Sequence, residues 1–316
     1  MNNEPNIYNK AAKFAKISAI TSGILAFVIA LSYFFALRFD FDYGIGHFER
    51  GSIFFYILVT SIIAAAALPA ALAVYSKKKA SITTLPSVSG AHVFLTIFAS
   101  AMAVFAFASS IPDLSMYLAT SKLSFFSVIG LLVIAVALIT SVVSGMSSSP
   151  LVQILLTLSV LAMDIQVLAA YFDQTLTLNS PVRHITMLAE LSVMIFLLSE
   201  ARLAFGLAKA GDTSVALRAS FPFYVFANNA SAALSIGFSI GAILHDIIPG
   251  GSHSFTAHHP HVLRLAMYAI LGVLALLRAF QAAKISSPYV PLPENGDEAK
   301  ADTANDTNPP EATEEN

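Results

Sequence analysis

Eight apolar runs, each close to twenty residues long, fill the chain from about residue 14 to residue 283. A bilayer core about 30 Å thick needs about 20 apolar helical residues to cross it. The runs show no alternation of apolar and polar residues, so they predict helices and not the strands of a membrane barrel. The predicted fold is therefore all-α: a polytopic membrane protein whose transmembrane domain, residues 1–285, is a bundle of about eight helices. The predicted spans are 14–37, 52–75, 91–110, 124–146, 151–172, 184–206, 217–245 and 262–283.

Composition agrees with this class and excludes several others. Charged residues make up 11% of the 316 residues, against about 25% in soluble domains, so lipid is the expected solvent for most of the surface. The absence of cysteine excludes disulfides, thiolate metal sites and iron–sulfur clusters. The sequence has no phosphate-binding loop and no HExxH, so no cofactor is expected. Basic residues are sparse, which argues against nucleic acid as a partner. The lipid bilayer is the predicted partner, and an oligomer or an accessory subunit is compatible with it.

The distribution of basic residues predicts the orientation. Most of the 17 Lys and Arg residues fall on the side that carries the N-terminus, which is typical of the cytoplasmic side of a cell membrane. An even number of spans then places both termini in the cytoplasm. Residues 286–316 are rich in proline and acidic side chains, and such a segment cannot bury enough apolar surface to fold. We therefore expect a disordered cytoplasmic tail there.

Two acidic residues fall well inside the predicted spans. At 1.5 Å per residue, Asp164 lies roughly 4–5 Å and Glu190 roughly 7–8 Å to the outer side of the midplane. Asn228 and Asn229, in the seventh span, fall close to the midplane by the same measure. Ionisable residues at this depth face protein or water and mark candidate ion pathways. The four side chains are therefore the predicted substrate or ion pathway.

The seventh span also indicates a packing face. Asn229 shares a four-residue spacing with Gly237 and Gly241, and a GxxxG pattern lets another helix approach closely. We therefore expect Asn229 to point into the bundle, beside Glu190 or Asp164. Two interpretations stay open: a cation or proton site, or polar residues that only join helices by hydrogen bonds.

Two further acidic and basic residues lie near the cytoplasmic end of the sixth span. Glu200 and Arg202 are two positions apart, so they do not face each other on a helix. Each needs a partner elsewhere or must reach the lipid headgroups. An anchor at the headgroups is the favoured interpretation, and a cytoplasmic gate is the alternative.

Histidines gather on the predicted outer side. All of them except His92 fall there, including His47, His184 and His245, and the last long loop adds His253, His258, His259 and His261. Neutral imidazole is a common metal ligand, so the four loop histidines are a candidate metal site. The alternatives are a solvated loop and a sensor of the outer pH.

The first outer loop contains the pattern Asp40-Phe-Asp42. Two acids at this spacing could hold a divalent cation against the phosphate of a lipid-linked substrate, and the alternative is an aromatic belt at the membrane interface. The leading functional hypothesis is a secondary transporter or permease for a small cation or a proton-coupled solute. A non-catalytic accessory subunit or sensor is the second, and a metal-dependent enzyme on the outer face is the third.

Overall fold

Eight helices of the computed structural model are long and apolar enough to cross a membrane, as the sequence predicts. The structure describes residues 4–42, 45–49, 51–76, 80–82, 88–144, 149–172, 180–208, 213–248 and 262–288. The spanning helices are α1 (Glu4–Phe35), α2 (Ile53–Ser76), α3 (Gly90–Ser110), α5 (Lys122–Val143), α6 (Pro150–Tyr171), α7 (Pro181–Ala208), α8 (Thr213–Ile247) and α9 (Val262–Ile285).

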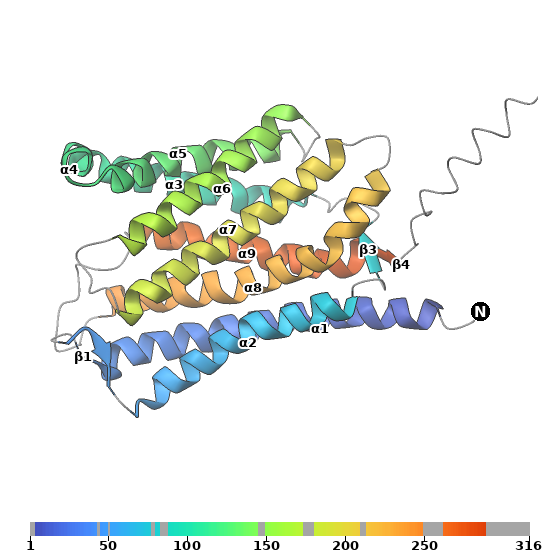
Figure 1. Ribbon diagram of the computed structural model, residues 1–316, viewed down its shortest axis with the longest axis horizontal. Helices are drawn as coiled ribbons and strands as arrows, with labels where there is room; N and C mark the ends of the chain where they lie inside the picture. The colour runs from blue at the N-terminus through green and yellow to red at the C-terminus, as the bar shows by residue number, and fades with distance from the viewer. Residues whose placement is uncertain are drawn as a thin grey trace, which may run out of the picture.

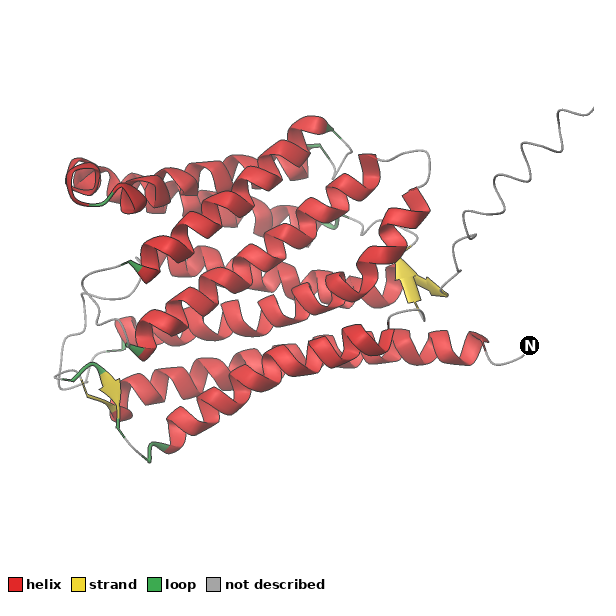
Figure 2. Ribbon diagram, in the orientation of Figure 1, coloured by secondary structure: helices red, strands yellow, loops and turns green. Residues whose placement is uncertain are grey.

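Short elements occur at the ends of these helices (Figure 2). A π-helical turn, Ala36–Asp40, extends α1, and a 3-10 turn, Ile111–Asp113, leads from α3 into the short helix α4 (Leu114–Thr120). Strands β1 (Phe41–Asp42) and β2 (His47–Phe48) form an antiparallel hairpin. Strand β3 (Ala80–Ile82) pairs with β4 (Ser286–Pro288).

The start of α1 and the end of α9 lie at the same end of the bundle (Figure 1). We call this the termini end, and we call the opposite end, which carries β1 and β2, the hairpin end. The pairing of β4 with β3 places the first three residues of the predicted tail at the termini end. The rest of that tail, residues 289–316, lies outside the described residues. Which end faces the cytoplasm stays a prediction.

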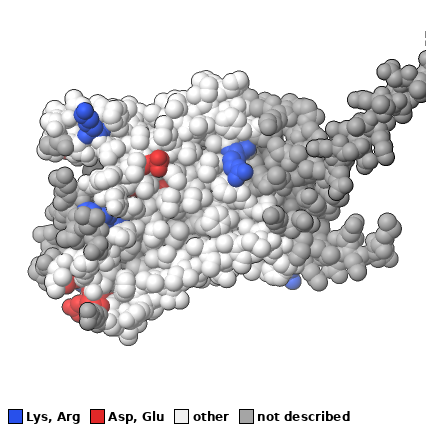
Figure 3. All heavy atoms as spheres, in the orientation of Figure 1, with Lys and Arg blue, Asp and Glu red and all other residues white. Residues whose placement is uncertain are grey.

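The sequence begins two helices with proline, at Pro150 and Pro181. Proline suits the first turn because the amide hydrogen that it lacks would have no partner there. Internal hydrogen bonds satisfy most of the backbone along the helices, which is the condition for crossing hydrocarbon. Pro69 inside α2 and Pro222 inside α8 each interrupt this pattern, because proline has no amide hydrogen. Large apolar side chains are exposed along the helices, and charged atoms lie mostly near the two ends of the face seen in Figure 3. This surface matches a lipid environment.

Helix α8 is the centre of the bundle and packs against α1, α2, α7 and α9 (Figure 1). Its glycines explain the closest of these contacts. A Cβ atom added to Gly237 would lie 2.6 Å from Cβ of Ile29, and one added to Gly241 would lie 2.8 Å from the carbonyl oxygen of Ala30. The GxxxG pattern therefore does let another helix approach closely, as predicted, and that helix is α1.

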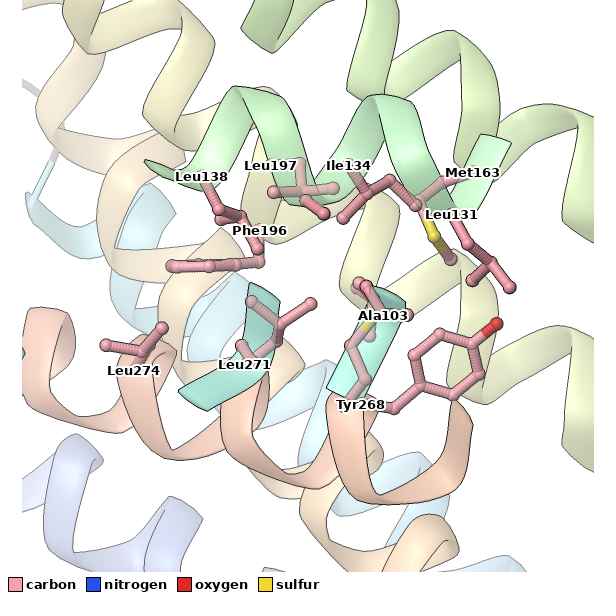
Figure 4. Close-up of a cluster of buried hydrophobic side chains, with 14 of the residues drawn as sticks. Ala103, Leu131, Ile134, Leu138, Met163, Phe196, Leu197, Tyr268, Leu271 and Leu274 are labelled. Carbon is pink, nitrogen blue, oxygen red and sulfur yellow. The ribbon is translucent and has the colours of Figure 1, made fainter. Parts of the chain in front are cut away.

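A cluster of buried apolar side chains fills the space between α3, α5, α6, α7 and α9. Figure 4 shows Phe196 and Leu197 of α7 beside Leu271 and Leu274 of α9, with Tyr268 at one edge of the cluster. We call this cluster the apolar plug. It matters for function because it occupies the stretch of α7 between Glu190 and Glu200.

Candidate functional site

Helix α7 carries two buried carboxyl groups, one toward each end of the bundle. Glu190 is 1% exposed and Glu200 is 5% exposed. Their ten-residue separation places them about 15 Å apart along the helix. Each is the acidic member of a polar cluster, and the apolar plug lies between the two clusters.

The hairpin-end cluster consists of Gln166 of α6, Glu190 of α7 and Tyr268 of α9. The hydroxyl oxygen of Tyr268 lies 2.6 Å from Oε1 of Gln166 and 3.3 Å from Oε1 of Glu190. A tyrosine hydroxyl has one hydrogen to donate, but its oxygen can also accept. It can therefore donate to only one of these two neighbours at a time, and the shorter distance favours Gln166.

Two atoms of this cluster have no hydrogen-bond partner among the described residues. They are Oε2 of Glu190 and Nε2 of Gln166, and both are buried. Buried polar atoms are nearly always paired, so each exception needs an explanation, which can be a catalytic or transport role. The guanidinium of Arg264, one helical turn before Tyr268 on α9, is the cation that acts electrostatically on Glu190.

A small crevice reaches this cluster between α1, α7, α8 and α9. Its walls include Tyr33, Thr186, Phe238 and Tyr268, and it leaves about 10 Å³ of free space. That space is close to the minimum for one water molecule. Of the hairpin-end cluster, only Tyr268 borders this crevice, and the crevice as it stands is too small for a solute larger than water.

The termini-end cluster consists of His92 of α3, Glu200 of α7 and Arg278 of α9. Arg278 donates from Nη2 to Oε2 of Glu200 at 2.9 Å and from Nε to Oε1 at 3.1 Å. Nη2 also lies 3.3 Å from Nε2 of His92, and Nη1 donates to Gln281 at 3.0 Å. Arg278 is 0% exposed, and this two-pronged geometry is the strong form of the arginine–carboxylate pair.

This pair corrects the sequence-based expectation for Glu200. The residue does not anchor to headgroups; it is buried and paired across helices. Arg202, by contrast, is exposed, and its guanidinium lies 4.6 Å from the ring centroid of Phe223. Glu200 turns inward because its cation comes from α9, 78 positions further along the chain, which spacing within one helix cannot reveal.

The two asparagines of α8 join helices at mid-depth. Asn228 donates to the carbonyl of Tyr224 at 2.8 Å and to the hydroxyl of Ser199 at 3.3 Å. Asn229 donates to its own helix, and its side-chain oxygen accepts from Ser22 of α1 at 3.1 Å. Both are buried, as predicted, but neither bonds to Glu190 or Asp164. These contacts match the alternative in which polar residues hold helices together.

Asp164 corrects a second expectation. The sequence predicts that it points into the bundle beside Glu190, but its side chain is exposed on α6. Gln166, two positions further on and 1% exposed, takes the inward place. The prediction that Asp164 and Glu190 lie side by side inside the bundle is therefore wrong, because depth along a helix says nothing about which side of the helix faces the interior.

The acids of the loop between α1 and α2, which the sequence predicts to lie on the outer side, hold a local turn. Asp40 accepts a hydrogen bond from the hydroxyl of Ser52, and Asp42 accepts one from the backbone of Ile45 at 3.2 Å. Phe41 and Phe48 face each other across the hairpin. The acids therefore shape the hairpin, and nothing in this arrangement points to a shared metal.

The outer histidines that the structure describes stand apart from one another. The ring of His184 contacts the carbonyl of Ser180 at 3.0 Å, and the ring of His245 lies 3.5 Å from Asp246. Among the described residues, no three His, Asp or Glu side chains could hold a metal ion together. The four predicted loop ligands lie outside the described residues: His253, His258, His259 and His261.

Sequence reasoning missed four members of the two clusters: His92, Gln166, Tyr268 and Arg278. The sequence did contain a signal for Arg278. It is a charged residue inside the eighth apolar run, and it falls toward the same end of the predicted bundle as Glu200. No comparable signal marks Gln166 or Tyr268.

Comparison with other proteins adds no assignment to this geometry. No family model matches the chain, and searches of curated proteins and of solved structures find no similar protein. The function must therefore be argued from the two clusters themselves.

Proposed function

We propose that the chain is a secondary transporter of the cell membrane that couples a small solute or cation to a proton carried by Glu190. The observation that supports this is the buried carboxyl group of Glu190, which has one oxygen without a partner among the described residues and contacts Tyr268, a wall residue of a crevice with room for about one water. In this proposal the hairpin end faces outward and both termini are cytoplasmic.

The hydrogen bonds around Glu190 suit a group that gains and loses a proton. When Glu190 is protonated, it can donate to the oxygen of Tyr268, whose hydroxyl donates to Gln166. When Glu190 is ionised, a rotation of the Gln166 amide lets Nε2 donate to Tyr268, whose hydroxyl then donates to Glu190. In both states the Tyr268 hydroxyl both donates and accepts, so the cluster can change protonation without leaving Tyr268 unpaired.

The other half of the bundle supplies the closure that a transporter needs. The apolar plug separates Glu190 from the termini end, and beyond it the Glu200–Arg278 pair ties α7 to α9. A proton on Glu190 can therefore exchange with the hairpin end alone in this conformation. Release to the other side requires α9 to part from α7, as expected for alternating access between two helix groups.

The test is proton flux in vesicles that hold the purified chain, with a pH-sensitive dye inside and a potassium diffusion potential as the driving force. Flux is measured with protons alone and again with sodium present. Wild type should acidify the interior faster than empty vesicles, and Glu190→Gln should fall to the empty-vesicle rate. Glu49→Gln is the matched control, because Glu49 is an exposed acid of the hairpin.

A second measurement does not depend on knowing the solute. Infrared spectra at several pH values should show the carbonyl band of one protonated carboxyl that exchanges with deuterated water and is missing in Glu190→Gln. The absence of both flux and this band in folded protein would overturn the proposal.

The second candidate is a non-catalytic membrane subunit. It is favoured by the inter-helix bonds of Asn228 and Asn229 and by the small size of the crevice. It predicts that wild type and Glu190→Gln both show the proton flux of empty vesicles. The same two measurements therefore separate the candidates.

A further inference from the structure

Asp164 lies on the exposed side of α6, and no described residue is its partner. Its neighbours on that face are apolar: Leu161 is 53% exposed and Leu168 is 40% exposed. Within the described part of the chain, its carboxyl group makes no hydrogen bond or ion pair. Figure 3 shows how few acidic atoms interrupt the middle of the apolar face that the bundle presents there.

The depth of Asp164 excludes the membrane surface as its partner. It lies seven residues before the end of α6 at Tyr171, which is about 10 Å below the hairpin end. An aspartate side chain is too short to span that distance to the headgroups. Ionisable residues at such depth almost always pair or face a polar interior, so an exposed carboxylate there needs a partner that also lies within the membrane.

Another copy of this chain does not offer the required cation on its described exposed surface. Arg202 is exposed on α7, but it lies 21 residues after Pro181, about 30 Å from the hairpin end. Lys122 is exposed at the very start of α5, at the hairpin end itself. The other cations that the structure describes as exposed lie toward the termini end: Lys13, Lys16 and Lys284. Two copies packed side by side in the same orientation would therefore leave Asp164 level with none of these cations.

We infer that this face of α6 binds a transmembrane helix of another protein. That helix carries a lysine or arginine at the depth of Asp164, about 10 Å from the hairpin end of the bundle. The cation pairs with Asp164 within the hydrocarbon, where each charge alone would be costly. Leu161 and Leu168 pack against the apolar side chains of that helix, as van der Waals contacts drive helix association in lipid. This partner is independent of the transport proposal.

The probe is a synthetic single-span helix of leucine and alanine with one lysine at the matching depth, compared with the same helix carrying leucine there. Binding to the fluorescently labelled full chain is followed by energy transfer in vesicles. The lysine helix should bind about ten-fold tighter, a difference of about 1.4 kcal/mol. Asp164→Asn should remove that preference, whereas Asp113→Asn, at an exposed acid near the end of α3, should keep it. Equal binding of the two helices to wild type would overturn the inference.

The lack of cysteine allows the occupied face to be mapped in the same vesicles. A nitroxide on Leu161→Cys should become less accessible to oxygen when the lysine helix is added. A nitroxide on Val136→Cys, which is 49% exposed on α5, should not change. If Leu161→Cys forms disulfide-linked dimers even when the lysine helix is present, this face binds a second copy of the chain. That result would overturn the inference.

Discussion

Glu190 and Glu200 share one helix but lie in opposite surroundings. Glu200 meets the guanidinium of Arg278 through two hydrogen bonds. One of the same nitrogens, Nη2, also contacts His92, and Nη1 donates to Gln281. Glu190 meets one tyrosine hydroxyl at 3.3 Å and keeps an oxygen without a partner among the described residues. One acid is held by a countercharge through direct hydrogen bonds. The other is hydrogen-bonded to a neutral group that can exchange roles, and the cation that acts on it, Arg264, makes no hydrogen bond to it among the described residues.

The difference indicates what each cluster can do. A buried ion pair is costly to break, because separation leaves two charges without compensation. It therefore suits a closure that opens only in a concerted helix movement. A carboxyl group among neutral donors and acceptors can change its protonation at smaller cost, so it suits the carrier of a proton. The predictions below test this contrast.

The largest expected effect comes from removing the cation of the termini-end cluster. Arg278→Leu should lower the free energy of unfolding by about 3–5 kcal/mol, because it leaves Glu200 buried without its countercharge. Unfolding in mixed micelles by a denaturing detergent, followed by circular dichroism, measures the change. Lys284→Leu, at an exposed position of the same helix, is the control and should change stability by less than about 0.5 kcal/mol.

The double variant Glu200→Met with Arg278→Leu sharpens that prediction. Replacing both charges by apolar side chains of similar size is often neutral, so most of the lost stability should return. A double variant as unstable as Arg278→Leu alone would show that packing, and not charge, holds this end together.

A matched pair of amide substitutions compares the two acids directly. Glu200→Gln should cost about 1.5–3 kcal/mol, because the bonds of Arg278 lose their charged acceptor. Glu190→Gln should cost less than about 1 kcal/mol, since an amide oxygen can still accept from Tyr268. Both are measured by the same unfolding assay, and equal costs would remove the contrast on which the transport proposal is built.

A tyrosine at each end allows a smaller comparison. Tyr268→Phe removes the hydroxyl that contacts Gln166 and Glu190, and it should cost about 1 kcal/mol. Tyr224→Phe removes a hydroxyl whose hydrogen bond to the carbonyl of Arg278 is long, at 3.4 Å, so it should cost less. In a titration with denaturing detergent, Tyr268→Phe should unfold at a lower midpoint than Tyr224→Phe. The reverse order would contradict this prediction.

The smallest effect is expected at mid-depth, between the two clusters. Ser22→Ala removes the inter-helix bond to Asn229 and should cost about 0.6 kcal/mol, the average for such bonds in a membrane bundle. Ser18→Ala, one turn earlier on α1, is the control, because Ser18 has no hydrogen bond to any described residue. If Ser22→Ala destabilised the protein as much as Arg278→Leu, Asn229 would have a larger structural role than one hydrogen bond between α1 and α8.

Much of the fold could be predicted because the run length that crosses a bilayer is written directly into the sequence. Each predicted span overlaps one long helix. The ends differ by at most four residues, except that α1 begins at Glu4, ten residues before the predicted start. The GxxxG pattern of α8 correctly indicated a close helix contact, because small side chains are a local property. The partner helix, α1, could not be read from that pattern.

The candidate site was predicted less well. Glu190, Asn228 and Asn229 are buried as expected, but Asp164 is exposed, and Gln166, Tyr268 and Arg278 were not foreseen. The helix rise gives depth with fair accuracy, so the level of Asp164 was predictable. Its direction was not, because lipid and protein interior are equally apolar and the sequence carries little record of which helix face is buried.

The sequence by itself determined that the chain crosses a membrane with eight helices and that a few polar groups lie within the hydrocarbon. Only the tertiary structure decided which of those groups meet. Glu200 and Arg278 are joined by the packing of α7 against α9, and Glu190 and Asp164 are separated by the rotation of α6. Hydrophobicity fixes the position of a helix along the membrane normal, whereas its rotation and its neighbours follow from side-chain packing and from pairing between residues distant in the chain.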